Sequence, residues 1–198
     1  MKVCRVFFVL LLVLAAASAT CSILFPQFRK TLDSGRNDKK TVNFWYQQRS
    51  ISSPTTPEFI ITRTYSKDLP CPQARLYFTI MAALSVSGAG LLGLSVLFAA
   101  CWINARNAIA LPVVSTSLTF CACVFYGAIL GLVVYIRKLT LCGDDPSARL
   151  ALQADGFFFA EGFYLLCVAT GSAFISAITG LVLCCIAVCS GKDSDKDV

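Results

Sequence analysis

The stretch Leu76–Trp102, LYFTIMAALSVSGAGLLGLSVLFAACW, decides the fold of this chain, because it runs from end to end without a charged side chain. A bilayer core of roughly 30 Å is crossed by about 20 apolar residues in a helix, so this stretch is long enough to span it. Three further stretches are as long and apolar and have no charge near their middle: Val6–Phe25, Ala108–Ile136 and about Phe157–Cys189. We therefore predict an all-α transmembrane protein, a four-helix membrane bundle that forms one domain over residues 1–198 with the lipid bilayer as its solvent.

Composition supports this prediction. Hydrophobic residues make up 57% of the chain and charged residues only 14%, whereas soluble domains carry about a quarter charged residues. The net charge of +6 comes mainly from the polar segment Arg29–Arg75, which is also rich in Ser, Thr and Pro. A solvated loop explains this clustering better than a nucleic-acid site does, so no nucleic-acid partner is expected.

The residue types needed for catalysis are scarce. The chain has no histidine, and its eleven cysteines do not form a paired C-x-x-C pattern, so we expect no metal and no cofactor. Asp155 and Glu161 are the only acids near a span, and both lie at its entrance. The sequence therefore predicts that the protein is not an enzyme and has no catalytic residue.

The large outer loop, residues 26–75, is expected to contain a small β-structure. Thr41–Tyr46 (TVNFWY) and Phe59–Tyr65 (FIITRTY) are rich in β-branched and aromatic residues, which favours two short strands. Trp45 is the only tryptophan in this loop, and it is expected to anchor the sheet at the membrane face, with a partner contact as the alternative.

Cysteines indicate the orientation that the charges leave open. The two longer loops hold twelve Lys and Arg, against five in the termini and the short turn, but long loops are translocated with little regard to charge. With cytoplasmic termini, five cysteines lie at inner helix ends, where reversible palmitoylation occurs: Cys4, Cys101, Cys184, Cys185 and Cys189. We therefore expect a multi-pass plasma-membrane protein with both termini in the cytoplasm.

In that orientation the two remaining polar-segment cysteines, Cys71 and Cys142, lie outside, where a disulfide persists. Cys71 precedes the second span and Cys142 follows the third. A very short turn joins these two spans, so they must be antiparallel neighbours with outer ends within about 10 Å. We predict a Cys71–Cys142 disulfide.

Small residues recur at four-residue spacing in the spans, for example Cys123, Gly127 and Gly131 in the third and Ser172, Ser176 and Gly180 in the fourth. Such residues let helices approach closely in lipid. Packing within one chain is the simpler interpretation, and contact between copies in a homo-oligomer is the alternative.

These features together resemble the amastin family of trypanosomatid surface proteins. That family has four spans, a large first loop and the signature C-x-[TS]-x-W-[GA]-x-K-x-x-C. The stretch Thr41–Ile51 aligns with the signature and keeps its aromatic core, Phe44-Trp45, while Thr41 and Ile51 stand where the family has cysteines. Cys71-Pro72, Cys142 and the motif Phe159-Ala160-Glu161-Gly162-Phe163 extend the likeness along the chain.

The resemblance implies a divergent amastin-like tetraspan protein of the cell surface at a host–parasite boundary, with a structural or interaction role and a host or surface protein as partner. Two alternatives stay open, a small oligomeric channel or transport accessory and a claudin-like adhesion protein.

The N-terminal run has a rival interpretation. Lys2 and Arg5, an apolar stretch and Ala17-Ser18-Ala19 resemble a cleaved signal peptide, but apolar residues continue to Phe25. We predict that the run stays attached as the first span. Intact-mass measurement of the mature protein should recover it, and a chain that starts at Thr20 would leave three spans.

Overall fold

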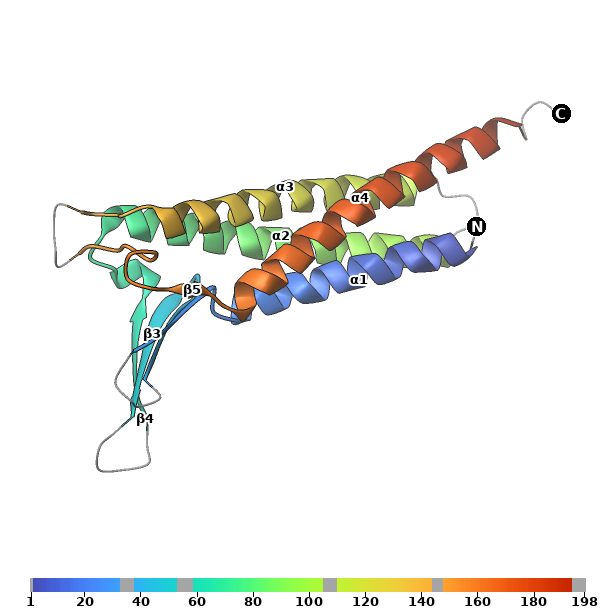
Figure 1. The fold of residues 1–198 in the computed structure, drawn as a ribbon. Coiled ribbons are helices and arrows are strands. Elements are labelled where there is room, and N and C mark those ends of the chain that lie inside the picture. Colours follow the sequence, from blue (N-terminus) through green and yellow to red (C-terminus); the bar gives the residue numbers. More distant parts are fainter. Residues whose placement is uncertain (1, 33–37, 53–58, 105–109, 144–147, 194–198) are drawn as a thin grey trace. The chain divides into compact units, whose positions relative to one another are not determined.

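The computed structural model describes residues 2–32, 38–52, 59–104, 110–143 and 148–193. It contains four long helices and a five-stranded antiparallel sheet (Figure 1). The helices are α1 (Lys2–Leu24), α2 (Pro72–Asn104), α3 (Ala110–Lys138) and α4 (Glu161–Asp193).

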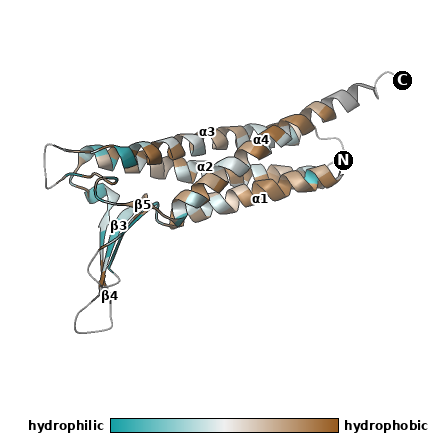
Figure 2. Ribbon diagram, viewed as in Figure 1, coloured by the Kyte–Doolittle hydropathy of each residue, from teal (hydrophilic) through white to brown (hydrophobic). Residues whose placement is uncertain are grey.

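All four helices are long and apolar enough to cross a membrane, which confirms the number of spans expected from the sequence. Their spanning parts are Val3–Leu24, Pro72–Ile103, Ala110–Lys138 and Glu161–Ile186. Figure 2 shows hydrophobic residues predominating along the helices, whereas the strands carry more hydrophilic ones.

Each helix starts a few residues from the expected position, and the starts of α2 and α4 have identifiable causes. Helix α2 begins earlier, at Pro72, because proline suits the first helical position and the Sγ atom of Cys71 accepts a hydrogen bond from the Ala74 N–H, 3.4 Å away. Helix α4 was expected to begin at Phe157, and this was wrong. Phe158–Phe159 form strand β5, and their pairing with Phe28 and Arg29 takes the place of a first helical turn.

The sheet has the strand order β4-β3-β2-β1-β5. Its other strands are β1 (Phe28–Thr31), β2 (Lys39–Val42), β3 (Tyr46–Ser52) and β4 (Phe59–Tyr65). The expected strand Phe59–Tyr65 is confirmed and pairs with β3 along its whole length. The expected strand Thr41–Tyr46 was wrong, because Asn43, Phe44 and Trp45 form the turn between β2 and β3.

The chain folds into two compact units. The helical unit comprises Met1–Thr20, Ser87–Gly127 and Cys167–Val198, and the sheet unit comprises Cys21–Val86 and Ala128–Leu166. Each of the four helices contributes a segment to both units.

The core of the helical unit is formed by Phe8, Leu12, Ala99 and Trp102. Arg5 closes one side of it, since its guanidinium lies 4.5 Å from the Trp102 ring and donates a hydrogen bond of 3.2 Å to the Trp102 carbonyl. The charge is thereby partnered beside an apolar core.

A buried hydroxyl cluster joins α2 to α3 within the same unit. The Ser95 hydroxyl lies 2.9 Å from that of Ser115 and 2.7 Å from that of Thr119, and Ser115 donates to the Ser95 carbonyl at 3.0 Å. Because each hydroxyl has a partner, these groups hold the helices together without leaving a polar atom exposed to lipid.

The small residues of α3 and α4 serve different surfaces. Ser172, Ser176 and Gly180 are buried, and a Cβ atom on Gly180 would meet Thr116 and Phe8, so this row packs inside the chain. Gly127 and Gly131 are exposed, with no atom within 4 Å of a Cβ placed there. The small residues on α4 therefore pack within one chain, whereas no described atom packs closely against Gly127 and Gly131 on α3.

Candidate functional site

The turn between β2 and β3 contains the aromatic pair Phe44-Trp45. Phe44 is almost fully buried, whereas Trp45 is 43% exposed. Two backbone carbonyls of the turn are fixed by Ser66, whose Oγ donates to Phe44 at 2.7 Å and whose N–H donates to Trp45 at 2.8 Å. Trp45 is thus presented outward from a rigid turn.

The same turn caps α1. The Asn43 side chain donates a hydrogen bond of 3.0 Å to the Leu24 carbonyl, and the Gln27 side chain donates one of 2.7 Å to the Ser22 carbonyl. Carbonyls in the last turn of a helix have no partner within that helix, so these amides replace the missing bonds. Sequence reasoning missed both residues, although Asn beside an aromatic pair is a recognisable turn signal.

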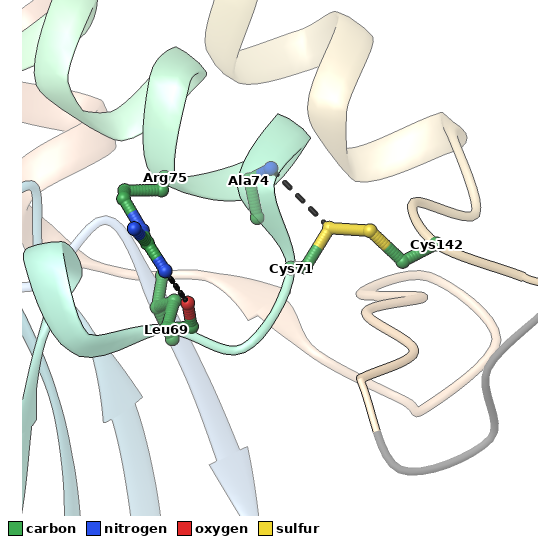
Figure 3. The surroundings of a disulfide bond; sticks show 5 residues. All are labelled: Leu69, Cys71, Ala74, Arg75 and Cys142. Carbon is green, nitrogen blue, oxygen red and sulfur yellow. Dashed lines mark hydrogen bonds between the residues drawn. A yellow bond between two sulfur atoms is a disulfide. The ribbon is translucent and has the colours of Figure 1, made fainter.

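The structure joins Cys71 and Cys142, the same two cysteines that the sequence paired (Figure 3). The sulfur atoms are 2.03 Å apart and the Cα atoms 5.9 Å, and the two positions have a sequence separation of 71. Arg75 supports the segment before α2 by donating a hydrogen bond of 2.9 Å to the Leu69 carbonyl. The bond ties the end of the large loop to the segment after α3.

Cys142 directly follows one residue of an antiparallel bridge. Leu141 and Leu150 exchange two backbone hydrogen bonds of 2.8 and 3.0 Å, and Cys142 adopts a φ of 51° just after Leu141. A non-glycine residue with positive φ is uncommon and is favoured only by its surroundings. The bridge and the disulfide together hold the backbone in place at Cys142.

The motif Phe159–Phe163 joins α4 to the strand β1. Phe159 stacks on Phe28 at 5.8 Å and on Phe163 at 3.8 Å between ring centroids. The Ala160 N–H donates to the Gln27 carbonyl and the Gly162 N–H donates to the Pro26 carbonyl, both at 2.9 Å.

Glu161, in the same motif, forms an ion pair of 2.8 Å with Arg29. Both side chains are about half exposed, so the pair contributes at most about 1 kcal/mol. The role of this carboxylate is to fix the β1 edge, and Asp155 lies elsewhere, on an exposed turn.

Lysines surround Phe157 on the other side of β1. The Nζ atom of Lys40 lies 5.7 Å from the ring centroid and that of Lys30 6.0 Å. Burial lowers the pKa of Lys40, and Asp155 opposes that shift, while Arg49 and Lys30 add to it. This patch is basic and apolar together, which suits an interfacial position.

The proposed palmitoylation sites lie in the helical unit, which also contains both ends of the chain. Cys4, Cys101 and Cys185 are exposed free thiols and Cys184 is a partly buried one, 3.7 Å from the Thr116 hydroxyl. The side chain of Cys189 lies outside the described residues.

The described residues contain no group of three His, Cys, Asp or Glu side chains that could hold a metal ion. What the sheet unit offers instead is a rigid, cross-linked surface with outward aromatic and aliphatic side chains.

Comparison with known proteins adds no relative. No protein-family model matches the chain, and no curated protein is significantly similar to it.

We predict that peptide mapping without reduction recovers a linked Cys71–Cys142 peptide. In the chain-entropy model a loop of this length stabilises the fold by about 4 kcal/mol, less whatever a membrane already restrains. Recovery of both cysteines alkylated without prior reduction would contradict the bond. Thioester cleavage before the same mapping reports whether any of the five candidate cysteines is acylated, namely Cys4, Cys101, Cys184, Cys185 or Cys189.

We also predict that Gly162→Ala destabilises the sheet unit. A Cβ atom there would lie 2.6 Å from the Phe25 carbonyl and 2.7 Å from the Pro26 carbonyl, and backbone atoms cannot rotate away. Overpacking of this kind costs about 1–3 kcal/mol, so the thermal midpoint in detergent should fall.

Gly171→Ala is the matched control on the same helix, because nothing lies within 4 Å of its Cβ position. Alanine favours helix over glycine, so this variant should keep or raise the midpoint. Equal midpoints for the two variants would refute the packing argument at Gly162.

Proposed function

We propose that this protein is a non-catalytic tetraspan protein of the plasma membrane, with both termini in the cytoplasm, and that its sheet unit contacts a protein partner outside the cell. It would then be a divergent amastin-like surface protein. The observation that carries the proposal is the open edge of the sheet at strand β4.

The distribution of cysteines supports this orientation. The disulfide belongs to the sheet unit, and the described thiols near the termini belong to the helical unit. Disulfides persist in an oxidising space outside the cell, whereas cytosolic thiols are kept reduced. An extracellular sheet unit accounts for both.

Strand β4 is exposed on both of its faces. Ile60 and Ile61 point to opposite faces and remain 59% and 54% exposed, and Tyr65 is 52% exposed. Natural proteins usually protect such an edge with charges, proline or a covering segment. Within the described residues β4 has a neighbour on only one side, so its other edge is free.

The register shows which backbone groups are available. The Asn43 N–H donates to the Tyr46 carbonyl, so Tyr46 and alternate residues after it direct their backbone groups toward β2. The residues between them face β4 and use the backbone groups of Ile60, Thr62 and Thr64. The N–H and C=O groups of Ile61 and Arg63 therefore point to the free edge.

An extended polypeptide segment is the ligand that fits such an edge. It alone offers a row of backbone donors and acceptors at strand spacing, and its side chains could pack against the exposed Ile61 and Tyr65. This mode of strand addition is a known route to protein–protein recognition.

A channel has less support. Arg5, Arg75, Arg137 and Glu161 lie at helix ends, and the polar groups of the interior are paired hydroxyls such as Ser95 and Thr119. Ion pathways usually carry ionisable groups near the middle of the membrane. A flux assay in liposomes should therefore stay at the level of empty vesicles.

The strand-addition proposal predicts the effect of Ile61→Pro. Proline removes one outward N–H and leaves the β3–β4 ladder intact, since Ile61 does not use its N–H toward β3. A photo-crosslinker at Arg63 on intact cells should give a polypeptide adduct that Ile61→Pro abolishes.

Ile61→Val is the control, because it keeps the N–H and most of the apolar side chain, and it should keep the adduct. Backbone hydrogen exchange at Ile61 and Arg63 should slow when the captured partner is added to the purified protein. Adducts that persist in Ile61→Pro, or exchange that does not change, would refute strand addition.

A further inference from the structure

A polar cavity of about 350 Å³ lies beside the end of α3 in the sheet unit, and none of its lining residues belongs to β4. Four of its lining residues are polar, Arg137, Lys138, Thr140 and Gln153, and the others are Leu139, Ala151 and Ala154. No carboxylate is among these lining residues. From this cavity we infer a binding site for a phosphate group, the chemistry shared by a phospholipid headgroup and free phosphate.

The first reason is the position of the Arg137 guanidinium over an aromatic ring. Its guanidinium carbon lies 4.2 Å from the centroid of the Phe159 ring, and Phe159 is itself held between Phe28 and Phe163. A guanidinium fixed over a ring keeps its N–H groups in its own plane, where they can pair with two oxygens of one anion. The Nε atom of Arg137 is buried and has no hydrogen-bond partner.

Charge is the second reason. Among the residues that the structure describes, the ion pair joins Arg29 to Glu161, and no described carboxylate pairs with Arg137 or Lys138. Asp155 is not among the lining residues of the cavity, and its charge acts on Lys40. Two adjacent cations with a hydroxyl and an amide nearby match the donors that bind phosphate.

The frame of the cavity is the third reason. The Gln153 N–H donates to the Arg137 carbonyl at 3.2 Å, and Phe157 donates to the Leu152 carbonyl at 2.9 Å. Leu141 and Leu150 form an antiparallel bridge, so the chain segments before Leu141 and after Leu150 are held side by side. A site with fixed walls loses little freedom when a ligand enters.

Position and size favour a lipid as the source. Lys138 is the last residue of the span Ala110–Lys138, so in a bilayer the cavity lies at the level of the headgroups. A water occupies about 30 Å³ in the liquid, so 350 Å³ has room for a phosphate ester and its hydration. This preference for lipid rests on the proposed membrane position, whereas binding of phosphate itself does not.

The test uses the full chain purified in a non-ionic detergent. Native mass spectrometry compares phosphatidylglycerol with a diacylglycerol that has the same acyl chains and no phosphate. We expect phosphatidylglycerol to bind and diacylglycerol not to bind. Arg137→Gln and Lys138→Gln should each weaken binding about tenfold or more, because each removes a hydrogen bond to a charged group.

Arg149→Gln is the matched control. It removes the same charge from the segment that follows α3, at an exposed residue that does not line the cavity, and binding should change less than about twofold. Arg137→Lys keeps the charge but lacks the planar fork, so it should also bind more weakly. A thermal midpoint in detergent equal to that of the unchanged chain verifies that each variant is folded.

Competition with inorganic phosphate shows whether the site binds the free anion as well as the lipid. If it displaces phosphatidylglycerol and loses affinity in Arg137→Gln, the site takes the free anion as well; if it does not compete, the site requires the lipid. Equal binding of the two lipids, or equal weakening by Arg149→Gln and Arg137→Gln, would overturn the inference. Ile61→Pro should leave phosphate binding unchanged, so this inference and the strand-addition proposal fail independently.

Discussion

Backbone N–H and C=O groups in an apolar solvent must bond to each other, because no water is present to bond them. Because of this constraint the four apolar stretches are helical along their lengths, and the backbone groups without a partner lie at the helix ends. The loops supply partners for these groups. Asn43 and Gln27 supply donors for the last carbonyls of α1, and Cys71 accepts a bond from the first turn of α2. The strands are therefore tied to the helices through the helices' own unsatisfied groups.

The sheet unit is held at two further points of different kinds. At one, the Gly162 N–H reaches the Pro26 carbonyl at a distance that excludes a side chain, and aromatic rings stack around it. At the other, the Cys71–Cys142 disulfide joins the end of the large loop to the segment after α3. Non-covalent packing and a covalent link act on opposite ends of the loop.

A unit that is anchored at one side of its sheet can leave the other side free. Phe28 on β1 is buried against Phe159, whereas Ile60 and Ile61 on β4 are exposed on both faces. The same anchoring fixes Phe159 beneath the Arg137 guanidinium and so orients its N–H groups. The strand edge proposed for a protein partner and the cavity proposed for phosphate both depend on this anchored side, although they lie at different elements.

The sequence alone determined the four helices, the strand Phe59–Tyr65 and the pairing of Cys71 with Cys142, since apolar length, β-branched composition and chain connectivity act locally or through one short turn. Only the tertiary structure decided that Asn43–Trp45 is a turn, that Phe158–Phe159 is a strand and that Gly162 needs to be glycine. Each of these depends on groups distant in the chain: the Leu24 carbonyl, the β1 edge and the Pro26 carbonyl. Aromatic and β-branched residues favour a strand wherever they stand, and the bonds that end one strand and begin another come from elements that composition does not bring together.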